Sequence, residues 1–381
     1  MADKHRPREA VDYSHLVREV FDTCLRVKPK DRVWIQSWDH TLDLARALTS
    51  GCSSRACSYL LSIRYEDLWL RSILDGSKEQ LSVVGSQEAA ALAETEFYIF
   101  TLGPRNPIPW SAIPKEKRGM VSVWLDVRYD KTPYAKEWAR IASEHRVRML
   151  AIEATLATPE RARAQGLNYE EWRNVMFKGC LVDHEKMARR GKVLAKLLSG
   201  RGNVRMTTPF GTDLSLELDR RPVGVSDGIA REEEAKMAMV TFLPAGALEV
   251  SVKEDSANGT VVYDVPVPAG TSRVDKLKVL VRDGQAIRHE AVAGDGVFQQ
   301  YLEEGGGGAG QCAFIGFGLN PNLRPGCTQD DKVLGGVTIG FGDNTTKGGK
   351  NTANGEWWAS MTRATVAIDG MTVLSNGKLL V

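Results

Sequence analysis

The sequence lacks the residue patterns on which most metal and redox sites depend. Its 381 residues include six histidines and six cysteines. The histidines are scattered singly, with no H-x-x-x-H or H-x-D pair, and no two cysteines form a C-x-x-C motif. Because transition metals in proteins are held mainly by clustered imidazoles and thiolates, this argues against a histidine-rich metal site. The cysteines are expected to be reduced thiols.

Long apolar runs and a strong net charge are also missing. No run is long enough for a signal peptide or a membrane span, so we expect a cytoplasmic protein without a membrane partner. The 50 basic and 48 acidic residues leave a net charge of +2, which gives no field that would recruit nucleic acid. A hydrophobic content of 43% over this length allows two domains with real cores.

The N-terminal half alternates predicted strands with predicted helices. Apolar runs predict strands at 31–36, 57–63, 97–100, 121–125 and 147–152, and amphipathic stretches predict helices at 41–48, 88–93 and 134–144. Continuous apolar strands between helices are typical of a parallel sheet covered on both faces. The helical segment 159–199 ends at a Gly-Arg-Gly stop, and we predict an α/β domain over residues 1–200.

Residues 201–381 change character and predict a strand-rich α+β domain that carries the site. Strands are predicted at 204–207, 214–218, 248–252, 259–265, 276–281 and 285–291. Asp283-Gly284 predicts a hairpin turn between the last two, and 297–303 predicts a helix.

The segment 311–370 concentrates glycine and small polar residues. It contains two similar phrases, Phe314–Gly318 and Thr338–Gly342, in which apolar residues are broken by glycine. Such phrases favour strands whose backbone closely approaches a ligand or another strand. Polar residues that suit turns follow each phrase, namely Asn320 and the pair Asp343-Asn344.

These motifs carry a family resemblance. The phrase GFGDNTTKGGKN, the later IDG turn, and the upstream phrases LPAG, EDSANGT and FGTDL occur in an order that resembles the thermophilic aminopeptidase family, aminopeptidases T and S. They are equally similar to the 2,5-dihydroxypyridine 5,6-dioxygenases, which share that architecture. The resemblance implies an aminopeptidase T-like fold and a homodimer.

The resemblance also implies metal ligands that this chain does not carry. The aminopeptidases hold two metal ions with Glu, Glu, His, His and Asp, and the dioxygenases hold one iron with two His and one Asp. The corresponding positions here are Ala247, Phe314, Thr338, Glu356 and Trp358. Such a set cannot hold two divalent ions, so we predict no metal and no cofactor.

A neighbouring carboxylate does not restore the ligand set in this interpretation. Glu249 lies two residues beyond Ala247 and alternates with Leu248 and Val250, so we expect it to face the other way.

The altered positions suggest a different chemistry. Phe314, Trp358 and Ala247 suit a flat apolar ligand held by stacking. Glu356 beside two tryptophans would have a raised pKa and is predicted to activate water as a general base. Thr338 is predicted to hydrogen-bond the substrate or that water. Because Trp357 and Trp358 alternate in an extended strand, only one of them can line the pocket.

Polar groups of the adjacent glycine-rich loop are predicted to assist. Asp343 is assigned a catalytic role, and Asn344 and Lys350 are assigned to substrate binding, where amide and ammonium donors stabilise an oxyanion. The alternatives are a turn role for Asp343-Asn344 and solvated side chains for Lys347 and Lys350.

We therefore predict a metal-independent hydrolase with a small aromatic, N-heterocyclic or amide substrate. Two alternatives stay open. One is a non-catalytic descendant of the family that binds a small molecule. The other is a metal-dependent aminopeptidase or ring-cleaving dioxygenase whose ligands are displaced.

Overall fold

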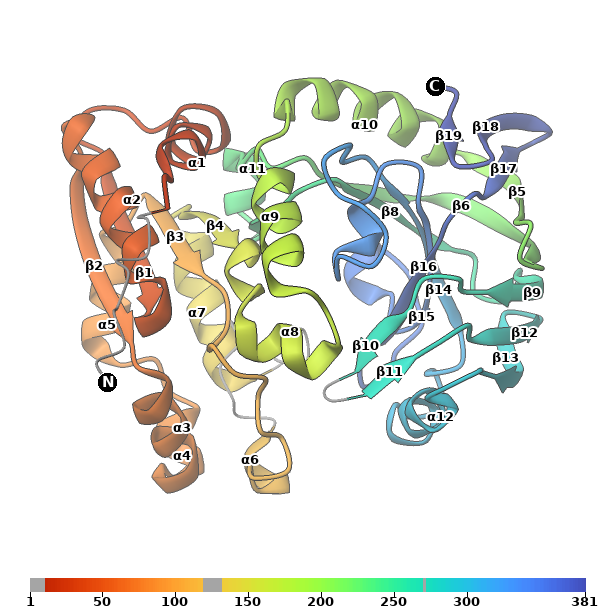
Figure 1. The fold of residues 1–381 in the computed structure, drawn as a ribbon, viewed down its shortest axis with the longest axis horizontal. Helices are drawn as coiled ribbons and strands as arrows, with labels where there is room; N and C mark the ends of the chain where they lie inside the picture. Colours follow the sequence, from red (N-terminus) through yellow and green to blue (C-terminus); the bar gives the residue numbers. More distant parts are fainter. Residues whose placement is uncertain (1–10, 119–131, 270–271) are drawn as a thin grey trace, which may run out of the picture.

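The computed structural model of the protein describes residues 11–118, 132–269 and 272–381, arranged around two main sheets (Figure 1). In the N-terminal part, the described strands form a parallel sheet in the order β2-β1-β3-β4-β7. These strands are β1 (Arg32–Trp38), β2 (Ser58–Arg64), β3 (Phe97–Thr101), β4 (Arg148–Ile152) and β7 (Val240–Leu243). The helices are α1 (Ser14–Arg18), the π-helix η1 (Glu19–Cys24), η2 (Asp39–Thr41), α2 (Leu42–Ser54), α3 (Glu66–Asp75), α4 (Lys78–Leu81), α5 (Ser86–Ala93), α6 (Lys115–Arg118), α7 (Pro133–Glu144), η4 (Glu153–Leu156) and α8 (Pro159–Gln165).

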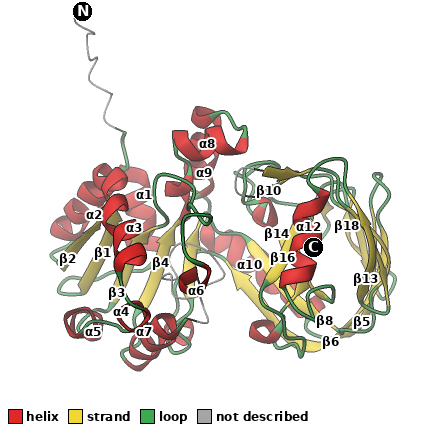
Figure 2. Ribbon diagram, turned by 90° about the horizontal axis from the view of Figure 1, so that it is seen from below, coloured by secondary structure: helices red, strands yellow, loops and turns green. Residues whose placement is uncertain are grey.

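Helices cover both faces of this sheet, as Figure 2 shows. Ile35 of β1 packs with Leu44 and Leu48 of α2, whereas Trp34 points to the opposite side. There it joins a second cluster with Trp138 of α7. Every residue of β3 is buried, as expected of a central strand with helices on either side.

Local signals explain why α7 begins where it does. The Thr132 hydroxyl accepts a hydrogen bond from Ala135 N at 3.0 Å, and Pro133 occupies the first helical turn, where its missing N–H costs nothing. Tyr134, Trp138 and Ile141 then recur at helical spacing and are buried against the sheet.

The second sheet contains the described strands from β5 onward, apart from β7 and a separate two-stranded ribbon, β10 (Val267–Ala269) with β11 (Ser272–Val274). Its main path runs β16-β15-β14-β8-β6-β5-β17-β18-β19, with β9, β12 and β13 attached beside β6. The strands are β5 (Arg201–Thr207), β6 (Asp213–Ser226), β8 (Ala247–Val252), β9 (Asn258–Val262), β12 (Lys278–Arg282), β13 (Gln285–Glu290), β14 (Cys312–Gly318), β15 (Val337–Gly342), β16 (Glu356–Met361), β17 (Thr365–Ile368), β18 (Met371–Ser375) and β19 (Lys378–Leu379). The remaining helices are α9 (Tyr169–Gly179), α10 (His184–Leu198), α11 (Glu232–Ala235), α12 (Asp295–Glu304), η5 (Asp330–Lys332) and η6 (Thr345–Lys347).

The predicted fold class is confirmed, and most predicted elements lie within a few residues of their observed positions. Asp283 and Gly284 both have positive φ, as the hairpin between β12 and β13 requires. The predicted strand 121–125 lies outside the described residues. The predicted division at residue 200 leaves out one strand, because β7 lies within 201–381 but pairs with β4 of the N-terminal sheet.

A buried ion pair joins the two parts of the chain. Glu153 follows β4 of the N-terminal sheet, and Lys332 ends η5, which packs on β8, β14 and β16. The ammonium of Lys332 contacts the Glu153 carboxylate, and the two side chains are 8% and 15% exposed. A charged group that is largely buried is stable only beside an opposite charge, so this ion pair holds η5 against the end of β4.

We predict that Lys332→Met lowers the free energy of unfolding by about 3–5 kcal/mol, because it leaves the Glu153 carboxylate buried and unpaired. Urea unfolding of the full chain measures the loss. The matched control is the double variant Glu153→Leu with Lys332→Met, which removes both charges and is expected to regain most of the stability. A loss below about 1 kcal/mol in the single variant would contradict a buried pair of this kind.

Candidate functional site

The five positions that the sequence resemblance aligned with metal ligands lie on one face of the C-terminal sheet. In the register, Phe314 pairs with Gly340, Gly340 with Trp358, and Thr338 with Ser360. Directly paired residues and residues two apart along a strand share a face. The shared face therefore carries the full set of Ala247, Phe314, Thr338, Glu356 and Trp358. We call it the site face.

The opposite face of the same strands is the hydrophobic core. Leu248, Ile315 and Ile339 are fully buried there. Trp357 belongs to this side, where its ring meets Phe298 of α12 at 4.7 Å between centroids. The two tryptophans thus alternate as the extended strand requires, and Trp358 is the one on the site face.

The expected orientation of Glu249 was wrong. Glu249 of β8 pairs with Gly316 of β14, and Gly316 pairs in turn with Thr338 of β15. The Glu249 side chain therefore lies on the site face. It is the residue two positions after Ala247, and a strand returns to the same face every second residue. A carboxylate is therefore present beside the position where the family pattern has lost one.

Lys347 of η6 brings the two carboxylates of the site face together. Its Nζ lies 2.9 and 2.7 Å from the two carboxylate oxygens of Glu356 and 3.7 Å from Oε2 of Glu249. The three side chains are only 19–29% exposed. Glu356 thus uses both oxygens on the ammonium, whereas Glu249 lies just beyond hydrogen-bond length from it.

Phe314 forms the floor of this cluster. The Lys347 ammonium lies 4.6 Å above the centroid of the Phe314 ring, a cation–π distance. The ring extends across Gly340, where a Cβ atom would come within 2.1 Å of a ring carbon. Glycine at position 340 is therefore what allows the aromatic ring to lie along the sheet. We define Glu249, Phe314, Lys347 and Glu356 as the central cluster.

Glu249 is the titrating group of the central cluster. Burial raises the pKa of Glu249 to about 7, an effect that the Lys347 ammonium opposes and that the Asp331 and Glu356 carboxylates reinforce. A carboxyl with a pKa near 7 exists in both protonation states at neutral pH, which suits it to accept and return a proton.

The glycine-rich loop that carries Lys347 is held by buried side chains. The Asp343 carboxylate accepts hydrogen bonds from Thr345 N at 3.0 Å and from the Thr345 hydroxyl at 2.6 Å. The Asn344 amide donates to Ala313 O at 3.2 Å and accepts from Asn351 N at 2.9 Å. Both predicted site residues are thus placed within the loop, where their contacts brace its backbone.

Lys350 is placed differently from the sequence expectation. Its side chain is exposed, and its backbone N donates to Oε1 of Glu254 at 2.7 Å. Glu254 also receives two bonds from Arg221, at 2.6 and 2.5 Å. The hydroxyl of Ser251, on the site face, donates to Lys347 O at 2.8 Å. The sequence did not single out Glu254 or Ser251 as loop anchors.

Thr338 lies at the other end of the site face. Its hydroxyl is 2.8 Å from the Ser360 hydroxyl, and both residues are nearly fully buried. Ser360 lines a cavity of about 370 Å³ between β16 and the segment around η5. Asp330 and Arg363 also line this cavity. A volume of this size is in the range of small-molecule sites.

The residues of the site face do not fit the family's metal ions. Of the five positions aligned with metal ligands in the sequence analysis, Glu356 alone offers a carboxylate, and both its oxygens are bound to an ammonium. Glu249 is the second carboxylate, and the same ammonium lies between the two. Among residues 11–118, 132–269 and 272–381, no group of three or more His, Cys, Asp or Glu side chains is arranged to hold a metal ion. A divalent ion at the central cluster would have to displace Lys347.

Glu254 gives the loop a defined response to pH. Burial alone would raise its pKa, but hydrogen bonds from Arg221 and Lys350 N outweigh burial and lower the pKa of Glu254 to about 2. Because this value lies below the ordinary 4.5, the stabilisation is fully present above about pH 4.5 and is lost as the pH falls toward 2.

We predict that Glu254→Gln lowers the free energy of unfolding by about 2 kcal/mol at pH 7, since the neutral amide forms weaker bonds with Arg221. Urea titrations at pH 7 and pH 2.5 measure the difference between this variant and the unchanged protein. The difference should shrink at the lower pH. A difference that grows on acidification would contradict the role assigned to the ionised carboxylate.

None of the helices in the described ranges is long and apolar enough to cross a bilayer.

Comparison with known proteins identifies structures with a similar fold and the family of the chain. The fold matches wild-type AmpT from Thermus thermophilus with a TM-score of 0.65 and 14% sequence identity, over 97% of this chain and 98% of AmpT. It matches 2,5-dihydroxypyridine dioxygenase from Pseudomonas putida KT2440 with a TM-score of 0.59 and 14% identity, over 98% of both chains. These similarities confirm the aminopeptidase T-like fold. No curated protein sequence matches the chain. The sequence model of the thermophilic metalloprotease family (M29) matches residues 11–315, and the chain belongs to that family.

Proposed function

We propose that the protein is a metal-independent hydrolase that acts on a small aromatic, N-heterocyclic or amide substrate. The observation that carries this proposal is the Lys347 ammonium, which lies between Glu249 and Glu356 on the site face. An ammonium so placed can stabilise negative charge on a substrate oxygen, and a carboxyl with a pKa of about 7 can transfer the proton.

The two carboxylates are assigned different roles because their contacts differ. Glu356 holds Lys347 through both oxygens, so we assign it to positioning the ammonium. Glu249 lies 3.7 Å from the ammonium and keeps a carboxyl group free for proton transfer. The role first predicted for Glu356, activation of water, therefore passes to Glu249 in this proposal.

The steps follow from these roles. Ionised Glu249 takes a proton from water as the water oxygen bonds to the electrophilic carbon of the substrate. Negative charge develops on the substrate oxygen or ring nitrogen, and the third N–H of Lys347 donates to it. The protonated Glu249 then returns its proton to the leaving nitrogen as the bond from carbon to that nitrogen breaks. Glu249 ends ionised, so the cycle is balanced.

The aromatic residues of the site face support a flat substrate. Trp358 is partly exposed on this face, and Phe314 lies beneath the ammonium. A planar ring between such groups gains stacking and apolar contact without a further charge. The cavity beside Ser360 lies at the Thr338 end of the site face, where the Thr338 hydroxyl is buried in a hydrogen bond with Ser360.

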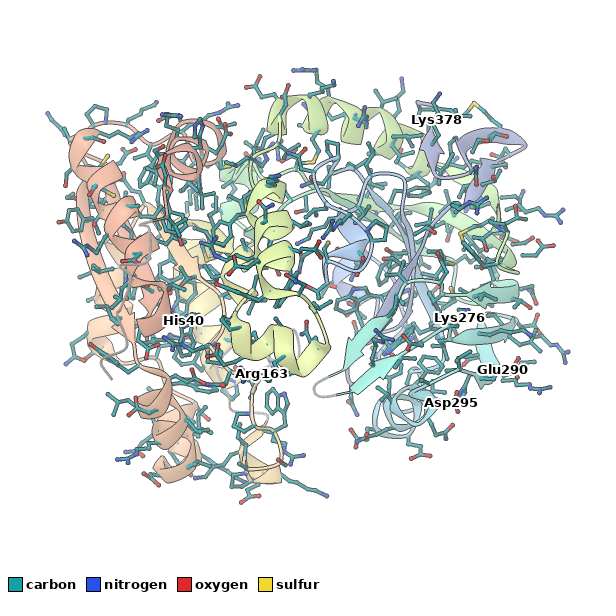
Figure 3. The ribbon with its side chains drawn as sticks, in the orientation of Figure 1. His40, Arg163, Lys276, Glu290, Asp295 and Lys378 are labelled. Atoms are coloured by element: carbon teal, nitrogen blue, oxygen red, sulfur yellow. The ribbon has the colours of Figure 1, made fainter. Side chains whose placement is uncertain are left out.

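We predict that Glu249→Gln lowers kcat/KM by about 10²–10⁴-fold, because the amide cannot accept a proton. In the unchanged protein kcat/KM should rise with pH through about 7, since the ionised form is the base, and this inflection should disappear in the variant. Steady-state rates across pH 5 to 9 on a panel of small amides and N-heterocycles provide the measurement, with Glu290→Gln as control. Glu290 lies exposed on β13, away from the site face (Figure 3). An unchanged pH profile in Glu249→Gln would remove Glu249 from proton transfer.

We also predict that protein stripped of metal by a chelator retains its turnover, and that Lys347→Met loses at least about a hundredfold in kcat because the stabilising charge is gone. Lys378→Met, an exposed lysine on β19, is the matched control (Figure 3). Elemental analysis accompanies the rates. Stoichiometric zinc, cobalt or iron, with activity that returns only when metal is restored, would instead favour an aminopeptidase or a dioxygenase.

Failure to turn over any compound, together with saturable binding that Glu249→Gln leaves unchanged, would favour a non-catalytic binding protein.

A further inference from the structure

A second cavity lies in the N-terminal part of the chain, distant from the site face. Its volume is about 400 Å³. It is bounded by the carboxyl end of β2, by α3 and α4, and by the first turn of α7. α3 and α4 lie at the lower left of Figure 1. In parallel α/β sheets, ligands bind beyond the carboxyl ends of the strands. The strand order here is that of a doubly wound sheet whose order reverses between β1 and β3, and the cavity lies next to that point, at the carboxyl end of the edge strand β2.

The walls of this cavity are mainly apolar and aromatic, and the uncharged side chains of Ser72 and Gln80 complete them. Trp69 and Leu68 of α3, Leu81 of α4, and Tyr134 of α7 line it. Trp69 is held edge-on against Trp38 of the core at 5.6 Å between ring centroids, so this wall is fixed from behind.

The apolar surface continues onto the rim of the cavity. Leu68 is 57% exposed and Val83 is 63% exposed, and Tyr65 beside them is also exposed. Large apolar side chains gathered around a hollow, rather than scattered singly, mark a binding surface.

A single positive charge lies within these walls. Arg64 is the last residue of β2, and its Nη1 is buried without a hydrogen-bond partner among the described residues. No described carboxylate forms an ion pair with it. The nearby Glu88 carboxylate accepts a hydrogen bond from the Tyr134 hydroxyl instead. A buried guanidinium donor that lacks an acceptor is costly, and a carboxylate satisfies it with charge-assisted bonds.

We propose that this cavity binds a small monocarboxylate with an aromatic or branched aliphatic body. The carboxylate pairs with Arg64, and the body lies against Trp69, Leu68 and Leu81. One guanidinium supports one carboxylate, and Arg64 is the only charged residue among the described residues that line the cavity. This site is independent of the proposed hydrolase reaction, since it involves no residue of the site face.

The test is isothermal titration calorimetry of the full chain with 3-phenylpropanoate and with its neutral analogue 3-phenylpropanamide. The acid should bind at least tenfold more tightly than the amide. Arg64→Met should weaken the acid at least tenfold and leave the amide unchanged. Ser72→Trp, an exposed position in the cavity wall, should abolish binding of both by filling the space while Arg64 stays intact. Arg163→Met, an exposed arginine of α8 outside the cavity, is the control (Figure 3).

Several outcomes would overturn the proposal. They are equal affinity for acid and amide, acid binding that survives Arg64→Met, and no binding of either probe at millimolar concentration. Self-association that Ser72→Trp disrupts, without probe binding, would show that a second copy of the chain covers the cavity. Thermal melts of each variant confirm that a lost signal reflects the cavity and not unfolding. Hydrolase turnover is unaffected by these substitutions if the two sites are independent.

Discussion

The C-terminal site depends on the need to neutralise a largely buried ammonium. Lys347 is 19% exposed and lies over an aromatic ring, so it requires carboxylates close by. Those carboxylates come from β8 and β16, which are separated in the sheet by β14 and β15. Two carboxylates around one ammonium leave one negative charge in excess. A single proton on Glu249 removes that excess, which agrees with a pKa of about 7 for Glu249.

The ammonium reaches this place because the loop that carries it is rigid. Glu254 ties the backbone of Lys350 to the Arg221 guanidinium, Asn344 ties the loop to β14, and Ser251 holds the backbone of Lys347 itself. Asn344 and Ser251 are buried, and Glu254 is half-buried with both its carboxylate oxygens hydrogen-bonded within the protein. Preorganisation of this kind keeps the charge in position before a substrate arrives, so binding energy is not spent on ordering the loop.

The sequence predicted the positions of the site face better than their chemistry. The resemblance in motif order assigned Phe314, Thr338 and Trp358 to one site, and alternation along a strand limited that site to one of the two tryptophans. The contact of Lys347 with both carboxylates depends on the path of a loop braced by residues almost a hundred positions away, which no local pattern records. The sequence analysis missed β7 for a related reason. This strand has four residues and is stabilised by pairing with β4, which is about 90 positions earlier in the chain.

A tethered ammonium and a pair of metal ions impose different demands on a substrate. Lys347 supplies one positive charge, where two divalent ions would supply four, and it does not lower the pKa of water as a bound metal ion does. Less stabilisation of the developing charge means that the substrate must contribute more of the reactivity. An electrophilic ring carbon or an activated amide meets that demand, whereas an ordinary peptide bond does not. In the proposed reaction, a single ammonium therefore favours small activated substrates over peptides, the class that the aromatic residues of the site face also favour.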